Sequence, residues 1–177
     1  EKLDPATGIF THYTYNIDPN NLINENASCI AEDHSNNMWI GTRGLFRLDQ
    51  KSKTFQHFLE SAIITSICVD KNGNIWVGSD DGLYWYDNKS AQFIQFLNPV
   101  AGSEIKEVKN ILEDDHQNLW ISNTSSILKI NDKRNEVRIY GENFGVHTNT
   151  LLTANNYASK NGEIFFADQG GYYEFKS

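Results

Sequence analysis

The sequence predicts an all-β fold, namely a β-propeller segment of about four four-stranded antiparallel blades that forms an incomplete arc of a larger propeller. One frame of short strand-like runs recurs four times along the 177 residues. Its period of roughly 37 to 45 residues is typical of a propeller blade. No segment shows the sustained 3.6-residue apolar period of an amphipathic helix. A helical solenoid of similar period is therefore disfavoured.

The repeated frame is centred on an aromatic residue in the second strand of each copy. These aromatics are Trp39, Trp76, Trp120 and, in a weaker fourth copy, Phe165. They are predicted to fill the space between neighbouring blades, because large aromatics bury much apolar area. The small residues that follow two positions later are Gly41, Gly78, Ser122 and Ala167. Small residues at this position indicate close approach by a neighbouring side chain or backbone.

An aspartate ends the first strand of the three stronger copies, at Asp33, Asp70 and Asp114. A short carboxylate at that position can accept hydrogen bonds from turn amides. A calcium site is disfavoured, because calcium needs six or more oxygens converging on one point, and these residues are spread one per blade. The sequence therefore predicts turn capping.

The frame divides residues 1–177, read as one propeller fragment, into blades. These are 28–58, 66–96, 109–140 and an incomplete final blade at 150–177. Residues 1–15 supply an outer strand, because Asp4 precedes Phe10 by the same interval as Asp49 precedes Phe55. That strand either completes the last blade or belongs to a preceding blade. The chain opens within the pattern, so we expect a piece of a larger protein.

Two assemblies follow from an arc with open ends. One is a strained four-blade ring closed by residues 9–15, and the other is self-association through the open blade edges. The second is favoured, since aromatics that pack between blades need a neighbour.

The charge narrows the classes of partner. The net charge is −8 at pH 7, whereas a nucleic-acid or anionic-membrane partner would require a basic face. No apolar run approaches the roughly 20 residues that cross a bilayer. We therefore expect no nucleic-acid partner and no direct membrane contact.

Few residues point to catalysis. The five histidines are scattered, and no metal, phosphate-loop or nucleophile motif occurs. Cys29 and Cys68 occupy different repeat positions and are expected to be structural thiols rather than a disulfide. We expect no catalytic residues, no metal and no cofactor. Two alternatives stay open: a propeller enzyme of the lyase or lactonase type, which would need polar residues on the inner strands, and a protein-interaction scaffold.

The frame "I-x-x-D, three residues, N-[IL]-W-[IV]-G-[TS], then G-L-[FY]" resembles the two-component regulator propeller repeat. The match is strong around Trp39 and Trp76, fair around Trp120 and weak around Phe165. The resemblance implies the periplasmic sensor region of a hybrid two-component histidine kinase. In that family the propeller senses oligosaccharides and, through the rest of the sensor protein, signals by phosphorelay across the inner membrane to control transcription.

A ligand would meet the rim that carries variable loops. In an up-and-down blade, the turns between the second and third strands share a rim with the crossovers between blades, and both vary here. Variable polar loops on a rigid scaffold are the usual binding positions. The candidate ligand-binding residues are Arg43, Asp80, Asp81 and Asn123. Trp85 and Tyr140 are candidate stacking surfaces, although packing on a blade face is favoured for both.

Overall fold

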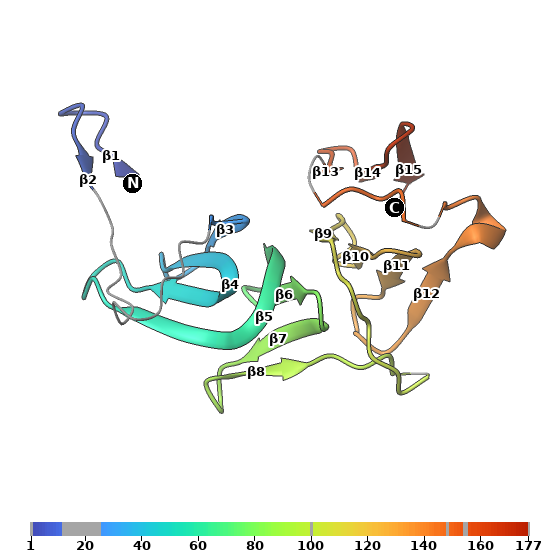
Figure 1. Ribbon diagram of the computed structural model, residues 1–177, viewed down its shortest axis with the longest axis horizontal. Coiled ribbons are helices and arrows are strands. Elements are labelled where there is room, and N and C mark those ends of the chain that lie inside the picture. Colours follow the sequence, from blue (N-terminus) through green and yellow to red (C-terminus); the bar gives the residue numbers. More distant parts are fainter. Residues whose placement is uncertain (1, 12–25, 100, 148, 154–155, 177) are drawn as a thin grey trace.

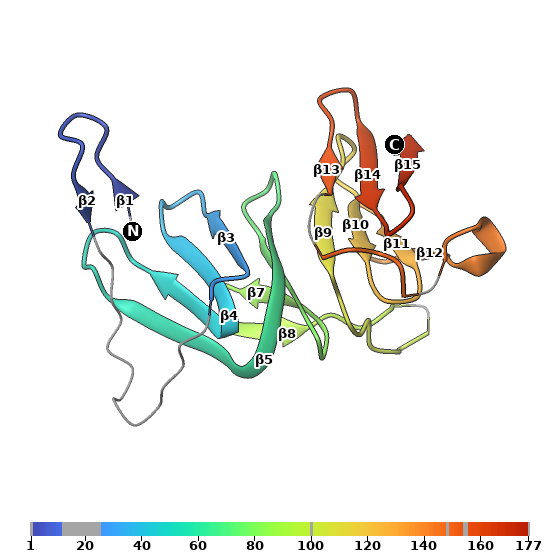
Figure 2. The same ribbon diagram turned by 45° about the horizontal axis from the view of Figure 1, so that its top comes forward.

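The structure, a computed structural model, describes residues 2–11, 26–99, 101–147, 149–153 and 156–176. Antiparallel sheets follow one another along an open arc (Figure 1). The N-terminal hairpin lies at one end of the arc and the last sheet lies at the other (Figure 2). This arrangement confirms the all-β propeller arc. No helix in the described ranges has the length and hydropathy to span a membrane.

The described residues form fifteen strands and one 3-10 turn. The strands are β1 (Lys2–Leu3), β2 (Phe10–Thr11), β3 (Cys29–Glu32), β4 (Met38–Leu48), β5 (Phe55–Val69), β6 (Ile75–Ser79), β7 (Leu83–Asp87), β8 (Gln92–Gln95), β9 (Asn110–Glu113), β10 (Leu119–Ser122), β11 (Ile127–Ile130), β12 (Val137–Tyr140), β13 (Tyr157–Ala158), β14 (Glu163–Ala167) and β15 (Tyr172–Lys176), and η1 (Glu142–Phe144) follows β12.

The first two blades share one hydrogen-bonded sheet in the order β3-β4-β5-β6-β7-β8. β4 carries the second and third strands of blade 1, with a register shift between Arg43 and Leu45. β5 carries the last strand of blade 1 and the first strand of blade 2. The sequence predicts breaks at both places, but strand pairing continues through a bulge in which residues 59–62 of β5 lie opposite Gly44. The φ of 90° at Gly44 suits glycine.

Blade 3 is a separate four-stranded sheet, β12-β11-β10-β9, and blade 4 has three described strands, β13-β14-β15. Of the predicted closing segment 9–15, residues 12–15 lie outside the described ranges. Within the described part, β2 pairs with β1, and no described strand pairs with the outer edge of β15. The two described strands of the hairpin form a sheet of their own, so the described residues give an open arc and not a closed four-blade ring.

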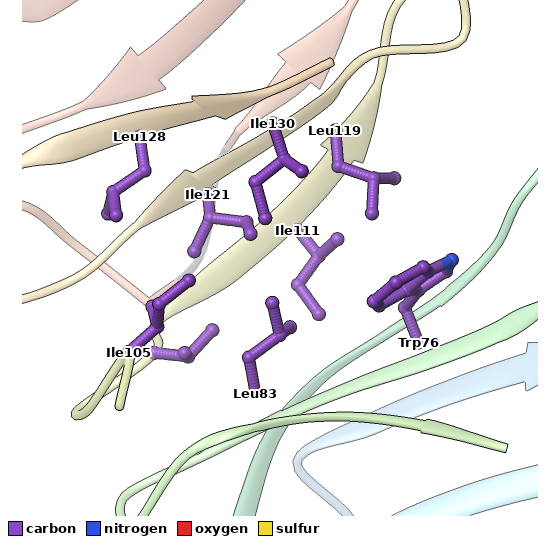
Figure 3. Packing of buried hydrophobic residues seen from close by; sticks show 9 residues of the cluster. Trp76, Leu83, Ile105, Ile111, Leu119, Ile121, Leu128 and Ile130 are labelled. Carbon is purple, nitrogen blue, oxygen red and sulfur yellow. The ribbon is translucent and has the colours of Figure 1, made fainter. Parts of the chain in front are cut away.

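Three apolar clusters fill the three seams between successive blades. At the seam of blades 2 and 3, Trp76 and Leu83 face aliphatic side chains of β9, β10 and β11 (Figure 3). The small residues permit this packing: a Cβ at Gly41 would collide with Ile64, and a Cβ at Gly78 would collide with Val108. The predicted close approach is therefore confirmed at both glycines.

Candidate functional site

Each of the first three blades carries the same polar clasp between its first turn and its tryptophan. In blade 2, Asp70 Oδ1 accepts hydrogen bonds from the backbone N–H groups of Asn72 and Asn74, at 3.1 and 2.8 Å. Asp70 Oδ2 accepts the indole Nε1–H of Trp76 at 3.0 Å. The Asn74 amide donates to both carboxylate oxygens. The sequence pointed to the turn capping but not to the indole bond.

The clasp repeats with nearly the same geometry in the neighbouring blades. The indole Nε1–H donates to the aspartate at 2.8 Å in both, from Trp39 to Asp33 and from Trp120 to Asp114. Burial opposes ionisation of these carboxyls, but the hydrogen bonds from the asparagine and the indole outweigh it. The pKa values of Asp33, Asp70 and Asp114 are therefore lowered from their ordinary value of 3.8.

The tryptophans of the clasps lie in the seams, with exposed fractions of 0 % for Trp39, 4 % for Trp76 and 2 % for Trp120. Phe165 differs from this expectation. It is half-buried and its ring contacts Tyr172, whereas the neighbouring Phe166 is 0 % exposed. The reason is the alternation of side chains along a strand. Phe166 points toward blade 3, and Phe165 points to the opposite face of β14.

Backbone hydrogen bonds connect the turns and the crossovers on the rim that carries the predicted ligand residues. The turn after β6 bonds to the following crossover, through Glu107 N–H to Asp80 O at 3.1 Å and Val108 N–H to Ser79 O at 3.0 Å. The corresponding turn in blade 3 accepts from its own crossover, through Asn149 N–H to Thr124 O at 2.6 Å. The second turn of each of these blades therefore lies beside the next crossover.

Three of the four candidate residues, Asp80, Asp81 and Asn123, lie in these rim turns, and each accepts a hydrogen bond from the protein. Asp80 Oδ1 accepts the backbone N–H of Ile63 at 2.8 Å. Asn123 Oδ1 accepts the backbone N–H groups of residues 125 and 126. Arg43, at the bulge in β4, has an exposed side chain. The asparagine side chain therefore caps its turn, and the guanidinium is accessible from solvent.

Asp81 belongs to a small hydrogen-bonded group on the same rim. Its carboxylate accepts from the Ser79 hydroxyl. Burial, together with the adjacent Asp81 carboxylate, raises the pKa of Tyr84 to about 12. The phenol is thus a proton donor throughout the neutral range. Carboxylate, amide, guanidinium and hydroxyl groups of this kind can both donate to and accept from a polyhydroxylated ligand.

Two further sequence candidates and the thiols have clear places. The Tyr140 ring stacks on Trp120, with centroids 5.9 Å apart, so it belongs to the seam. Trp85 is half-buried and lines a cavity at the opposite rim. Cys29 and Cys68 are unpaired, and burial raises the pKa of the Cys68 thiol to about 12, which leaves it a structural rather than a reactive group.

Comparison with known sequences identifies the repeats. The family described as two component regulator propeller matches residues 21–44 and 59–81. Histidine kinase P4 of Formosa agariphila is 36% identical over 84 residues, which are 44% of this chain and 6% of that protein. The resemblance of the repeat frame is thereby confirmed in the segments around Trp39 and Trp76.

Comparison with solved structures supports the fold. The extracellular domain of a hybrid two-component system of B. thetaiotaomicron superposes with a TM-score of 0.71 at 24% identity, covering 96% of this chain and 23% of that chain. PorZ, a surface component of the type-IX secretion system of Porphyromonas gingivalis, gives a TM-score of 0.74 at 15% identity, covering 99% and 28%. The chain therefore spans less than a third of the length of each relative.

Proposed function

From the two-component regulator propeller repeats that this chain carries, we propose that it is a ligand-sensing propeller module of a hybrid two-component sensor histidine kinase. The observation that carries the proposal is the repeated clasp of aspartate, asparagine and tryptophan in the frame that matches this family. The module would lie in the periplasm, as the extracytoplasmic part of an inner-membrane protein. It would act together with the remaining parts of the sensor, since it is similar to only a small share of a histidine kinase.

The ligand that we propose is an oligosaccharide, bound on the rim of the second turns and the crossovers. Arg43, Asp80, Asp81 and Asn123 would contact its hydroxyl groups. Arg43, Asp80 and Asp81 are the exposed charged members of this set, and the guanidinium donates hydrogen bonds while the carboxylates accept them. Asp80 and Asn123 would hold the turns in place, because each already accepts backbone N–H groups. We also propose that the blades of this module comprise residues 28–58, 66–96, 109–140 and 150–177.

Binding of an oligosaccharide panel to the complete sensor region, followed by calorimetry of the best ligand, tests this proposal. Arg43→Ala removes one charge-assisted hydrogen bond and is expected to weaken binding about tenfold. Lys89→Ala is the matched control, because it removes a cation of the same sign from an exposed turn on the opposite rim. It should leave the affinity unchanged.

Three outcomes would contradict the proposal. The first is the absence of binding by any oligosaccharide of the panel. The second is wild-type affinity in both Arg43→Ala and Asp81→Asn. The third is chemical conversion of the ligand, seen by mass spectrometry, which would favour a propeller enzyme of the lyase or lactonase type.

A further inference from the structure

The seam between blades 1 and 2 is closed by a dense aromatic group. Trp39 contacts Tyr86 and Phe93 of blade 2, with ring centroids 5.6 and 5.7 Å apart, and Phe58 of its own blade at 5.6 Å. Arg47 lies over the Trp39 ring at 5.6 Å. These side chains cover the Trp39 ring, and a cavity of about 240 Å³ beside Phe58 and Phe93 does not include this tryptophan in its lining.

The seam between blades 3 and 4 is closed in a similar way. Trp120 contacts Phe175 of blade 4 at 4.8 Å and Tyr140 of its own blade at 5.9 Å. Lys129 lies over the Trp120 ring at 4.9 Å. Phe175 stands in blade 4 where Tyr86 stands in blade 2, so both of these seams place an aromatic ring of the next blade against the tryptophan.

The seam between blades 2 and 3 breaks this pattern. Ile130 and Val137 stand where Tyr86 and Phe93 stand in blade 2, so smaller aliphatic side chains face Trp76. Trp85 stands where the other two blades have the cations Arg47 and Lys129, and it pairs with Trp76 across the strands. A cavity of about 340 Å³ opens at this seam. Its lining residues are Asn72, Asn74, Trp76, Trp85, Phe96, Asp132 and Arg134.

The cavity combines aromatic walls with a polar edge held in place by hydrogen bonds. Trp76 and Phe96 meet edge to face at 5.6 Å. Arg134 reaches across from blade 3, donates to the Gln117 and Asn131 carbonyls at 2.8 and 2.9 Å, and lies 5.3 Å over the Trp76 ring. Its position is therefore fixed before any ligand arrives.

The chemistry of the lining selects among small ligands. Indole and phenyl rings offer flat apolar faces to another ring. Arg134 forms an ion pair with the buried Asp70 at 3.4 Å, so this pair adds little net charge to the lining, and Asp132 disfavours an anionic ligand.

The amide nitrogens of Asn72 and Asn74 already donate to Gln117 and Asp70. The amide oxygens of these asparagines and the exposed Asp132 carboxylate are the acceptors at the edge. A volume of this size fits a single ring, because ligand pockets begin near 300 Å³.

We propose that this seam cavity is a second saccharide subsite, which binds one neutral pyranose ring against the half-buried Trp85, beside the buried Trp76. It lies on the rim of the first and third turns, opposite the rim of Arg43 and Asp81. The choice of a saccharide as the ligand rests on the proposed function, whereas the location of the subsite is inferred from the packing of the seam between blades 2 and 3. A long oligosaccharide could then contact the module at two separate places.

Nuclear magnetic resonance of the indole N–H groups tests the subsite directly in this chain. The four tryptophan signals are assigned with single Trp→Phe variants. The chain is titrated with methyl β-glucopyranoside up to about 20 mM, well above a millimolar Kd. Trp76 and Trp85 are expected to shift in a saturable way, whereas Trp39 and Trp120 stay in place because neighbouring side chains cover their rings. Benzyl alcohol serves as a ring of similar size without the ring hydroxyls.

Two variants alter the cavity with residues taken from the other blades: Trp85→Lys removes its aromatic wall, and Ile130→Tyr places a larger ring opposite Trp76. Trp85→Lys introduces the residue found at this position in blade 3, and Ile130→Tyr introduces the aromatic found in blade 2. Each is expected to weaken methyl β-glucopyranoside binding at least tenfold. Lys129→Arg, which gives blade 3 the cation of blade 1, is the matched control and should leave the titration unchanged. The spectrum of each variant reports whether it is folded, so that Trp85→Lys carries the test if Ile130→Tyr does not fold.

The proposal is overturned if the Trp76 and Trp85 signals do not move with the glucoside, or if only benzyl alcohol moves them. It is also overturned if Trp85→Lys binds like the wild type. Failure here is distinct from failure of the proposed function. Suppose that an oligosaccharide binds the complete sensor region with unchanged affinity in Trp85→Lys and with weaker affinity in Arg43→Ala. This result would support the proposed sensing rim and contradict only the proposed subsite.

Discussion

The first three blades and the last blade use different side chains to hold the turn between their first two strands. In the first three, an aspartate holds the turn amides, the asparagine and the indole of the tryptophan together. In blade 4 the equivalent residues are Ser159, Glu163 and Phe165. The backbone pattern survives, because Ser159 N–H still donates to Glu163 O at 2.8 Å and Gly162 N–H to Ser159 O at 3.1 Å. Ser159 Oγ accepts the Glu163 N–H at 3.0 Å.

This difference separates two roles of the clasp. The turn itself needs only a short side-chain acceptor and a residue that tolerates a positive φ, such as Gly162 at 81°. The carboxylate adds a link between the turn and the aromatic that fills the seam. The Phe165 side chain has no N–H to donate, and Ser159, at the position of the aspartate, has no carboxylate to accept one. The full clasp therefore occurs in the three blades whose second strand carries a tryptophan.

The largest expected effect contrasts two neighbouring phenylalanines of blade 4. Phe166→Ala should lower the free energy of unfolding by about 4 kcal/mol, because it leaves a cavity at a fully buried position. Phe165→Ala should cost under about 1 kcal/mol, because its ring is half-buried on the opposite face. Urea denaturation of both variants measures the difference. Equal losses would contradict the assignment of the two faces.

A smaller effect is expected from removing the acceptor of the clasp. Asp70→Ala leaves the indole N–H of Trp76, the Asn74 amide and the Arg134 guanidinium without their carboxylate, and should cost about 3 kcal/mol. Ser159→Ala is the matched variant in blade 4 and should cost about 1 kcal/mol, because only turn amides lose an acceptor. Denaturation midpoints at pH 7 give both values. A loss at Ser159 as large as that at Asp70 would show that the turn, and not the indole link, carries the energy.

The smallest expected effect is a dependence of stability on acid pH. The folded pKa of Asp114 is below its ordinary value of 3.8, so the unfolded chain binds its proton more readily. The contribution of Asp114 is therefore present above about pH 4 and is lost as pH falls through the folded pKa. Asp114→Asn should lose less stability between pH 5 and pH 3 than the wild type. Ser159→Ala should keep the full acid sensitivity, since Ser159 does not titrate.

Denaturation at several pH values in this range measures how steeply the free energy of unfolding changes with pH in the wild type, in Asp114→Asn and in Ser159→Ala. A slope of Asp114→Asn equal to that of the wild type would contradict the role of the carboxylate.

Much of the fold was predictable because the signal is repeated. One tryptophan would indicate little, but Trp39, Trp76 and Trp120 at the same place in three copies indicate stacked sheets. Gly41 and Gly78 gave a second, independent signal, which the side chains of Ile64 and Val108 confirm. Each feature recurs because each of these blades packs against the next blade in a similar way.

Other features could not be predicted because they depend on contacts between blades. The bulge at Gly44 that joins two strands into β4 depends on pairing with β5. The different faces of Phe165 and Phe166 follow from the orientation of blade 4 against blade 3. The seam cavity appears only when residues of blade 3, such as Arg134, are placed beside Trp76 and Trp85 of blade 2. Of the candidate rim, the sequence indicated the turns, while the bonds of Asp80 and Asn123 emerged from the folded chain.

By itself, the sequence determined the repeat, the strand content and the aromatic position that fills each seam, because these follow from spacing along the chain. Only the tertiary structure decided that the arc stays open in its described part, and that the three seams are packed unequally. Seam packing joins side chains of different repeats, and their volumes match or fail to match only after the blades have come together.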